Sequence, residues 1–427
     1  MLFRFFLPAF AGINSAVTMT NNSPVTPQKI LLLNQTFHPD VVATAQYLTD
    51  LATQLAARGH TVTVITGRRA YDQPDTVFPA VEMWQGIRIL RVWSSRFGKA
   101  AKWRRAADFA SFTLSCCWRL LWLRRQDVTV ALTSPPLVSW IAAWFARLRG
   151  GRFCYWVMDM NPDEAVAAGW LREGSRVTRV LEALSRFSLR HASRIVVLDR
   201  FMQALVLRKG VSADNVAVIS PWSQDERVRF EAAGREAFRR EQGFGNRFVV
   251  MHAGNHSPCH PLDTLLEAAA LLRDEAGIVF CFQGGGSGLA NVRAFVAEQK
   301  LPNVVCLPYQ PVEKLAGALS AADLHVVVMG DPFVGTIHPC KVYNALAVGA
   351  PLLYLGPETS HVTDILAGAV PPSPHISVRH GEASKLAETV LRLSKSPQRL
   401  SAGEMERTAT LCSRATLLPR MVAAVEG

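Results

Sequence analysis

The fold of this chain is decided by one stretch, residues 29–67, which reads KILLLNQTFHPDVVATAQYLTDLATQLAARGHTVTVITG. Residues 29–35 form an apolar run with a polar turn after it, which is typical of a buried strand. Residues 45–60 carry apolar side chains at helical spacing and contain a stop at Gly59, and residues 61–67 form a second apolar run. A strand, a helix and a strand of this length predict a right-handed βαβ unit, and therefore a parallel sheet.

The same alternation continues along the chain in two series. The strand-forming segments of the first series are residues 87–93, 128–136, 152–164, 194–210 and 215–226. Those of the second series are residues 247–255, 277–288, 303–311, 324–329 and 351–356. We therefore expect an α/β protein with two doubly wound, Rossmann-like domains joined near residues 224–236, and a ligand cleft between the carboxyl ends of the two sheets.

The composition limits the kind of partner. A chain of 427 residues is too long for one hydrophobic core, and its net charge of +12 indicates an anionic partner. Nucleic acid is the least favoured of these partners, because the charge lies among apolar residues and no recognition module is present. Eight cysteines without any C-x-x-C pair indicate reduced thiols in a cytosolic protein, not a disulfide framework or a zinc site.

The two predicted domains leave a segment at each end of the chain. Residues 1–27 are interpreted as a leader or a disordered segment, with Met19 as an alternative start. A signal peptide is less favoured, because the apolar run is short and is interrupted by Arg4 and Pro8. The first domain is then expected over residues 28–225 and the second over 226–400. Residues 401–427 form a segment short enough to pack back on the first domain.

Part of the first domain has the composition of a membrane-facing surface. Two apolar stretches, residues 109–123 and 137–148, are shorter than the roughly 20 residues that span a bilayer. Arginines and tryptophans surround them, a mixture that suits the headgroup region of an anionic membrane. The alternative is two buried helices with solvated ends. The tryptophans of this region are Trp103, Trp118, Trp122, Trp140, Trp144 and Trp156.

Two loops of the second domain are candidates for phosphate binding. Residues 254–268 read GNHSPCHPLDTLLEA, where Gly254 permits close backbone approach and Asn255, His256 and His260 can donate hydrogen bonds. The alternative is that polar residues here form only turns and helix caps. Residues 283–288, QGGGSG, include Gly285 and also indicate close backbone approach, but they do not match the dinucleotide-binding spacing.

A third candidate is the stretch TIHPCKVYNALAVGAPLLYLGP, residues 336–357. Lys341 stands at the expected helix start, where its charge suits a diphosphate, and no Asp or Glu occurs between Pro332 and Pro357. A solvated surface lysine is the alternative. In the first domain, Asp159 and Glu164 follow a strand that faces the cleft, where a carboxylate can orient a hydroxyl or accept its proton.

Several of these stretches together resemble one family. Residues 29–67 resemble the amino-terminal signature of family 4 glycosyltransferases, which have the GT-B fold. The stretches YWVMDMNPDEAVAAGWL, HAGNHSPCHPLDTLLEAA, LPYQPVEKLAGALSAADLHVV and HPCKVYNALAVGAP resemble later segments of the branch that assembles capsular and colanic-acid-like polysaccharides. The resemblance runs in the right order over about residues 29–364.

The resemblance implies retaining transfer of a sugar from a nucleotide-diphosphate sugar, with no cofactor and usually no metal. The acceptor would bind the first domain, and the donor the second. Asp159 and Lys341 are the candidate catalytic residues, and residues 37–44 would lie over the diphosphate. The candidate donor-binding residues are Gly254, Asn255, His256, Gly285, Pro308, Tyr309, Thr336, His338, Lys341 and Asn344, and those of the diphosphate or acceptor loop are His38, Asp40 and Thr44.

The sequence also departs from the family pattern. His256 and His260 occupy a loop where relatives commonly carry an Arg and a Lys, and Met158 stands where many carry a His. Thr336 and Asn344 fall where many relatives have acidic residues. Neutral side chains would weaken stabilisation of an anionic leaving group, which Lys341 would offset in part.

The expected setting is the cytoplasmic face of the cell membrane, with the protein bound peripherally. There it would extend a lipid-linked glycan with a sugar from a uridine or guanosine diphosphate donor. Two alternatives remain at this stage. One is a nucleotide-sugar epimerase of the same fold, and the other is a non-catalytic transferase-like assembly subunit.

Overall fold

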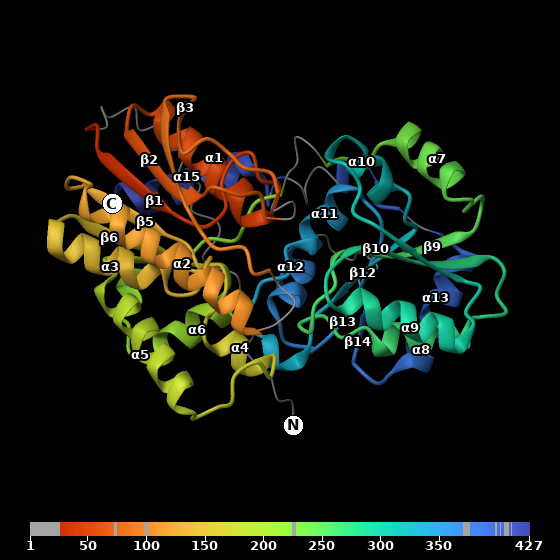
Figure 1. Ribbon diagram of the computed structural model, residues 1–427. Coiled ribbons are helices and arrows are strands. Elements are labelled where there is room, and N and C mark those ends of the chain that lie inside the picture. The colour runs from red at the N-terminus through yellow and green to blue at the C-terminus, as the bar shows by residue number, and fades with distance from the viewer. Residues whose placement is uncertain are drawn as a thin grey trace, which may run out of the picture.

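A computed structural model describes residues 26–71, 75–98, 102–223, 228–369, 376–397, 399–401, 403–404, 410 and 412–427. Two α/β domains lie next to each other, one built from the first half of the chain and one from the second (Figure 1). The expectation of two doubly wound domains is confirmed. Residues 1–25, most of the predicted leader, and residues 224–227 of the predicted junction lie outside the described residues.

The first domain contains an eight-stranded sheet with the order β3-β4-β2-β1-β5-β6-β7-β8. All neighbouring strands are parallel except β3, which pairs antiparallel with β4. Its strands are β1 (Lys29–Leu33), β2 (Thr61–Gly67), β3 (Val81–Trp84), β4 (Ile87–Val92), β5 (Val128–Ala131), β6 (Arg152–Trp156), β7 (Arg194–Val197) and β8 (Val216–Val218).

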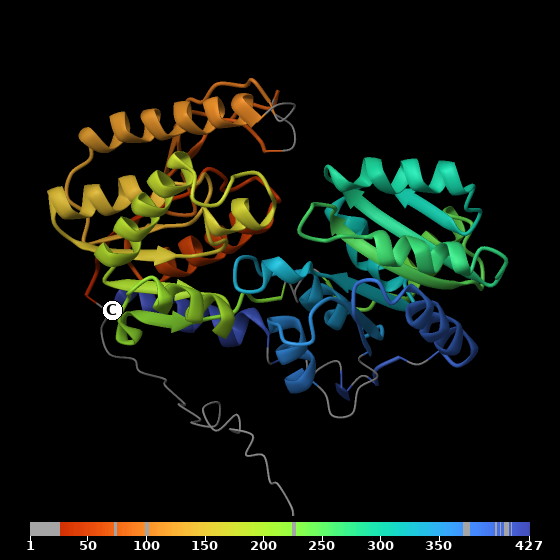
Figure 2. The same ribbon diagram turned by 90° about the horizontal axis from the view of Figure 1, so that it is seen from below.

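Helices cover both faces of this sheet. The helices α2, α3 and α5 pack together on one face, and α1 packs with the last helix, α15, on the opposite face (Figure 2). The bounds are α1 (Ala43–Ala57), α2 (Lys102–Leu121), α3 (Val138–Arg149), α4 (Asp163–Ala167), α5 (Arg176–His191), α6 (Arg200–Arg208), η1 (Ala213–Asn215) and α15 (Arg414–Glu426).

The second domain contains a six-stranded, fully parallel sheet with the order β11-β10-β9-β12-β13-β14. The strand order reverses between β9 and β12, so a ligand crevice is expected at the carboxyl ends of these two strands. The strands are β9 (Phe248–Asn255), β10 (Ile278–Gly285), β11 (Val304–Leu307), β12 (Leu324–Val328), β13 (Leu352–Leu355) and β14 (Ile376–Val378).

Alternate residues of β9 face two separate apolar layers. Phe248 and Val250 pack with helices α8, α9 and α13, whereas Val249 and Met251 pack with α7 and α10. This explains why the strand is apolar on both faces. The helices are α7 (Ala232–Glu241), α8 (Asp263–Leu271), α9 (Gly288–Gln299), α10 (Val312–Ser320), η2 (Asp331–Phe333), α11 (Lys341–Ala347), α12 (His361–Ala369) and α13 (Ala383–Lys395).

The chain returns to the first domain at its end. Helix α15 contacts α1, β5 and β7, and its apolar residues join the buried core of the first domain. Glu426 at the end of α15 also pairs with Arg58 at 2.6 Å and with His60 at 2.8 Å. The last segment is therefore part of the first domain's core although it follows the whole second domain in sequence.

Met421 tests this packing, because its side chain is fully buried in α15. Met421→Ala should lower the free energy of unfolding of the first domain by about 2 to 4 kcal/mol, since it removes buried apolar volume and leaves a cavity. The measurement is urea denaturation followed by tryptophan fluorescence. Ala423→Gln, on the exposed side of the same helix, should change the midpoint little. Equal effects of the two variants would contradict the packing.

Candidate active site

Two buried histidines, His252 and His260, lie at the expected crevice between β9 and β12. The Nδ1–H of His252 donates to the Val326 carbonyl at 3.0 Å, and that of His260 donates to the Val328 carbonyl at 2.7 Å. Burial, followed by the charge of Lys341, lowers the pKa of both imidazoles well below the usual value. Both rings are therefore neutral at physiological pH, and their Nε2 atoms carry lone pairs.

Lys341 enters this crevice from the first residue of α11. Its Nζ donates to the Asn255 carbonyl at 2.7 Å and to Nε2 of His252 at 3.1 Å. Burial lowers the pKa of Lys341 to about 7, because both hydrogen-bond partners are neutral and neither is a carboxylate. No carboxylate pairs with this amine, so in the empty site it is only partly protonated at physiological pH, and an anionic ligand would favour its charged form.

Gly254 makes room for this lysine. Its φ of +118° is a backbone conformation that side chains rarely adopt, and a Cβ at this position would lie 2.9 Å from Cε of Lys341. Any other residue would push the lysine out of its position. Gly254 and Lys341, both candidates from the sequence, therefore lie in direct contact.

The glycines of residues 284–286 allow close packing between two loops of the second domain. A Cβ on Gly284 would lie 2.0 Å from the Gly254 carbonyl oxygen, and one on Gly286 would lie 2.2 Å from Oδ1 of Asn255. The His256 N–H also donates to the Gly285 carbonyl at 2.7 Å. The three consecutive glycines allow this loop to pack directly on residues 254–256, which explains the close backbone approach that the sequence indicated.

The other donor-side candidates lie around this pair of loops. His256 is buried, and burial lowers its pKa to about 4, with Lys341 as the second cause. The ring of Tyr309, which follows the exposed Pro308, lies against Gly285, where a Cβ would be 2.7 Å from Cε2 of the tyrosine. Both residues follow the carboxyl end of β11, on the same edge of the sheet as Gly254.

Three candidates on the α11 side differ in their surroundings. The Thr336 hydroxyl donates to the Phe333 carbonyl at 3.0 Å, so it closes a turn. Asn344 is half-buried, one helical turn after Lys341. His338 is buried, with Nδ1 2.8 Å from Asp199 and Nε2 2.7 Å from the Tyr343 hydroxyl. Its ring nitrogens face the domain interface, not the Lys341 crevice.

The carboxylates of the first domain reach the same region. The Met160 N–H donates to the Thr336 carbonyl at 2.8 Å, so the loop after β6 is joined to the loop before α11. Burial and the neighbouring Glu164 raise the pKa of Asp159 to about 8. Burial also raises the pKa of Glu164, while Arg105 and Asn161 oppose this increase. Two carboxyl groups in one desolvated loop resist being ionised together.

The loop of residues 37–44 is held mainly by its own domain. The ring of His38 stacks on Trp84 with centroids 4.0 Å apart, and burial lowers its pKa. Asp40 accepts the Tyr71 N–H at 3.0 Å, and the Thr44 hydroxyl lies 3.1 Å from that of Thr36. These contacts position the loop at the carboxyl end of β1, on the edge of the sheet that carries Asp159.

Two residues that contribute to the site, His252 and Tyr47, were not predicted from the sequence. His252 lies inside an apolar strand, and its role depends on the β12 carbonyl opposite it, which no local pattern predicts. Tyr47 of α1 forms a side-chain hydrogen bond with Cys340, the residue before Lys341. An aromatic residue at helical spacing looks like ordinary core, so its contact with the other domain was not expected.

Comparison with known proteins agrees with this arrangement. A family model described as a glycosyl transferase 4-like domain matches residues 43–222. A relative named for colanic acid biosynthesis, the glycosyl transferase WcaI of Escherichia coli (strain K12), is 27% identical over 342 residues, or 75% of this chain and 81% of the relative. The glycosyltransferase WbjE of Pseudomonas aeruginosa is 26% identical over 245 residues, or 56% of this chain and 61% of that relative.

Residues 43–222 thus match a glycosyl transferase 4-like domain, and the chain as a whole is similar to family 4 glycosyltransferases. Solved structures agree on the fold of this transferase. Anabaena Alr3699/HepE in complex with UDP and glucose superposes with a TM-score of 0.68 at 16% identity, covering 94% of this chain and 100% of that one. WaaG, a glycosyltransferase involved in lipopolysaccharide biosynthesis, superposes with a TM-score of 0.66 at 16% identity, covering 93% and 100%. These relatives support neither the epimerase nor the assembly-subunit alternative.

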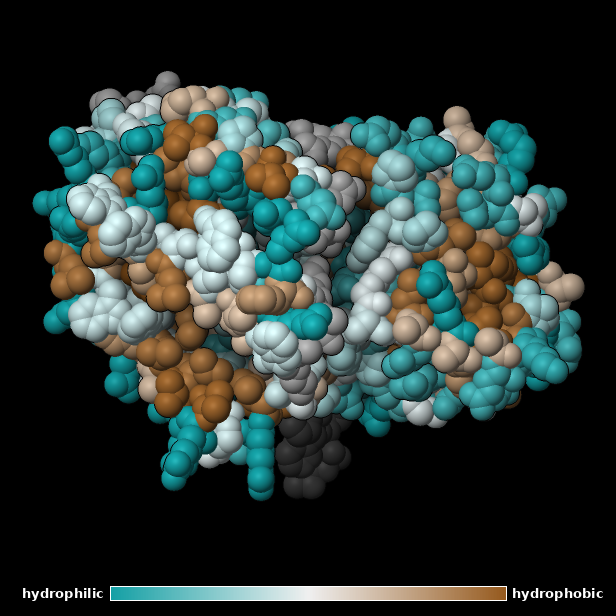
Figure 3. All heavy atoms as spheres, in the orientation of Figure 1, coloured by the Kyte–Doolittle hydropathy of each residue, from teal (hydrophilic) through white to brown (hydrophobic). Residues whose placement is uncertain are grey.

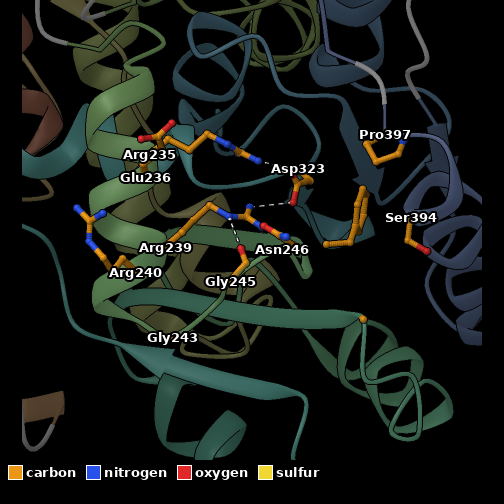
Figure 4. A pocket seen from close by; sticks show the side chains of 12 residues that line it. Arg235, Glu236, Arg239, Arg240, Gly243, Gly245, Asn246, Asp323, Ser394 and Pro397 are labelled. Atoms are coloured by element: carbon orange, nitrogen blue, oxygen red, sulfur yellow. Dashed lines mark hydrogen bonds and ion pairs between the residues drawn. The ribbon is translucent and has the colours of Figure 1, made fainter.

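A surface pocket of about 840 Å³ in the transferase lies away from this site (Figure 4). Three of the residues that line this pocket lie just before a strand or at its start, namely Phe248, Gly277 and Asp323. The pocket is therefore at the amino ends of the strands of the second sheet. There Arg235 donates to the Ser320 carbonyl at 2.7 Å and to Asp323 at 2.5 Å. The arginines of this pocket thus join the end of α10 to α7, a structural role.

The raised pKa of Asp159 predicts a dependence of stability on pH. The folded-state pKa of Asp159, about 8, lies above the ordinary value for an aspartate, so the folded protein favours the protonated form. The stability that comes from this protonation is complete below about pH 4 and is lost as the pH rises through 8. Asp159→Asn removes the charge. At pH 8.5 it should therefore raise the free energy of unfolding by about 1 to 3 kcal/mol, after a discount for partial solvent contact.

The measurement is thermal and urea denaturation of wild-type and Asp159→Asn protein at several pH values between about 5 and 9. Asp274→Asn, an exposed residue after α8, is the matched control and should behave like wild type. A variant that is less stable than wild type at pH 8.5 would contradict the buried, charge-disfavouring position of Asp159.

Proposed function

We propose that this transferase moves a sugar, with retention of configuration at the anomeric carbon, from a nucleotide-diphosphate sugar to a lipid-linked or polysaccharide acceptor. The second domain would hold the donor, and the first domain the acceptor. The observation that carries the proposal is the Lys341 ammonium, which is oriented by two neutral groups at the crevice between β9 and β12. An anionic ligand would favour the protonated form of Lys341 and would be neutralised by it.

The leaving group needs such a charge. Breaking the bond between the sugar and the diphosphate adds negative charge to the phosphate oxygens, which a positioned cation stabilises. The amino-terminal end of α9 adjoins the same loop, since the Gly288 N–H donates to the His256 carbonyl at 2.9 Å, and it adds a partial positive charge. His256 and His260 stay neutral, so we assign the main electrostatic role to Lys341.

Asp159 is the candidate for contact with the acceptor. Its pKa of about 8 lies near physiological pH, where the acid predominates and the minor ionised form is a stronger proton acceptor for a hydroxyl group than an ordinary carboxylate. The backbone contact between Met160 and Thr336 brings this loop to the donor side of the cleft. An acceptor hydroxyl between the two loops would therefore be close to both Asp159 and the donor sugar.

The relatives support a nucleotide donor and a glycan acceptor. HepE is described in complex with UDP-glucose, WcaI is named for colanic acid biosynthesis, and WaaG is described as involved in lipopolysaccharide biosynthesis. We propose a uridine or guanosine diphosphate donor and a role in the synthesis of a surface polysaccharide.

Lys341→Ala tests the donor site. The variant should lower turnover more than tenfold in a transfer assay with membrane fractions, because the leaving diphosphate loses its cation. Calorimetric titration with uridine and guanosine diphosphates should also show weaker binding. Lys395→Ala, at the exposed end of α13, is the matched control and should retain wild-type rates. Turnover of Lys341→Ala close to the wild-type rate would show that Lys341 is not a phosphate ligand.

The membrane contact is proposed from helix α2. Phe112, Cys116 and Leu120 face the core, whereas a second apolar stripe on the same helix faces solvent. The exposed stripe consists of Trp103 (63% exposed), Leu114 (70%), Trp118 (65%), Leu121 (61%) and, just beyond the helix, Trp122 (71%).

Neighbouring helices extend this surface. Leu148 at the end of α3 and Val177 and Val180 of α5 are also exposed, and arginines alternate with the apolar groups. Figure 3 shows hydrophobic patches separated by hydrophilic side chains over this face of the first domain. The alternative of a buried helix with solvated ends therefore describes α3, but it does not describe the outer stripe of α2.

The arrangement favours binding at the membrane surface. In the described part of the chain, no helix is long and apolar enough to cross a bilayer. Tryptophans among arginines suit the interface of an anionic membrane. The start of α2 also lies near the cleft, since Arg105 affects the pKa of Glu164. We propose that α2 lies on the cytoplasmic face of the membrane and brings the cleft to a lipid-linked acceptor.

Trp118→Ser combined with Trp122→Ser tests this surface. The double variant should bind vesicles of anionic phospholipid about tenfold more weakly than wild type in co-sedimentation, which corresponds to about 1.4 kcal/mol. Binding of wild type to zwitterionic vesicles should be weaker, because the arginines contribute to binding. Leu271→Ser, an equally exposed apolar residue on the second domain, is the control. Unchanged binding of the double variant would contradict the proposal.

A further inference from the structure

Three buried side chains of metal-ligand type meet at the domain interface. Asp199 comes from the turn between β7 and α6 of the first domain, whereas His338 and His361 come from the second domain. Their exposed fractions are 6%, 7% and 1%. Their candidate ligand atoms all lie within 4.8 Å of one another.

The geometry of the cluster is compact. Nδ1 of His338 lies 2.8 Å from Oδ2 of Asp199, and Nδ1 of His361 lies 3.8 Å from the same oxygen. The two imidazole rings stack with centroids 3.9 Å apart. Both histidines therefore present a ring edge to one carboxylate oxygen.

His361 is not accounted for by the protein alone. Within the described residues, neither of its ring nitrogens has a hydrogen-bond partner, although the side chain is almost fully buried. A buried polar group without a partner destabilises the fold. One ring nitrogen of a neutral imidazole carries a lone pair, and in His361 neither ring nitrogen has a partner within the described residues.

Hydrogen bonds from neighbouring groups orient the ligand atoms of the cluster, as is common around bound metal ions. Oδ1 of Asp199 accepts the N–H groups of Phe201 and Met202 at 2.9 and 2.8 Å, which leaves Oδ2 directed at the histidines. Nε2 of His338 lies 2.7 Å from the Tyr343 hydroxyl, so it can donate there while Nδ1 acts as the ligand.

We propose that Asp199, His338 and His361 bind one divalent transition-metal ion, most suitably Zn²⁺, across the domain interface. Two imidazole nitrogens and one carboxylate oxygen form a donor set that zinc prefers, with a further position for water. Ligand atoms on one zinc ion are typically about 3 to 4 Å apart, given bonds of about 2.0 to 2.2 Å, and the observed separations are close to this range.

The charges of the cluster agree with a cation. Asp199 supplies one negative charge, and the two histidines can coordinate as neutral ligands. The guanidinium of the adjacent Arg200 is directed at Asp364, with contacts of 2.5 and 2.9 Å, so that charge is already paired. A divalent ion would therefore be bound by one negatively charged oxygen and two nitrogen lone pairs. The positive charge of Arg200 would not repel it strongly, because that charge is paired with Asp364.

The ion would join the two domains. It would connect the start of α6 with the segment before α11 and with the first residue of α12, and His338 is only three residues before Lys341. It would not touch the donor diphosphate, since Lys341 is directed at Asn255 and His252. The site is thus separate from the proposed transfer reaction and can be tested even if that reaction is absent.

The test is metal binding by the full-length chain without an affinity tag. Elemental analysis by mass spectrometry, and calorimetric titration of metal-free protein with Zn²⁺, should give about one equivalent per chain. Zn²⁺ should also raise the thermal midpoint. His361→Ala should reduce the Zn²⁺ affinity at least tenfold and abolish the increase in midpoint. His191→Ala, an exposed histidine of α5, should bind like wild type.

Two further measurements keep the proposal testable if His361→Ala folds poorly. Asp199→Asn can still cap α6 but loses the charge, so it should retain the fold and bind Zn²⁺ more weakly. Wild-type protein with Co²⁺ should show visible ligand-field bands of four- or five-fold coordination, which Asp199→Asn should weaken. Absence of Zn²⁺ and Co²⁺ binding by wild type, or equal binding by folded variants, would overturn the proposal.

Discussion

The hydrogen bonds of the Lys341 ammonium determine how the candidate site is arranged. The ammonium is held by the Asn255 carbonyl and by Nε2 of His252, both neutral, so its charge is directed into the crevice and left for a ligand. This contact requires the neutral tautomer of His252, which the Val326 carbonyl on the neighbouring strand supports. It also requires a residue without a Cβ at position 254. The strand order, the tautomer of His252 and the glycine at position 254 therefore all help to position the amine of Lys341.

The two domains meet through a few specific contacts around this lysine. Met160 donates to the Thr336 carbonyl, Tyr47 contacts Cys340, and Asp199 contacts His338. All three contacts reach the short segment of residues 336–341. Because the carboxyl ends of both parallel sheets face this segment, the first domain can bring a carboxyl group, Asp159, to the side where the second domain holds its cation. Asp159 is kept partly protonated there by burial and by Glu164.

Much of the fold followed from hydrophobic periodicity, but the roles of several site residues did not. The βαβ pattern of residues 29–67 predicts a parallel sheet, and its repetition predicts two domains, because each pattern is local. The glycines of residues 284–286 indicated close approach, but only the register of β10 beside β9 shows that they pack on residues 254–256. His338 stands in a donor-like motif, yet its Nδ1 faces Asp199, more than a hundred residues earlier in the chain, and its Nε2 faces Tyr343.

The sequence by itself determined the α/β class, the two-domain division and the position of Lys341 at a helix start, since these depend on spacing along the chain. It also determined the basic, tryptophan-rich character of residues 102–125. Only the tertiary structure decided which of these groups act together. The neutral state of His252, the raised pKa of Asp159 and the outer apolar stripe of α2 all depend on burial and on partners distant in sequence. Burial depends on how distant parts of the chain pack together, so the order of residues along the sequence does not reveal it.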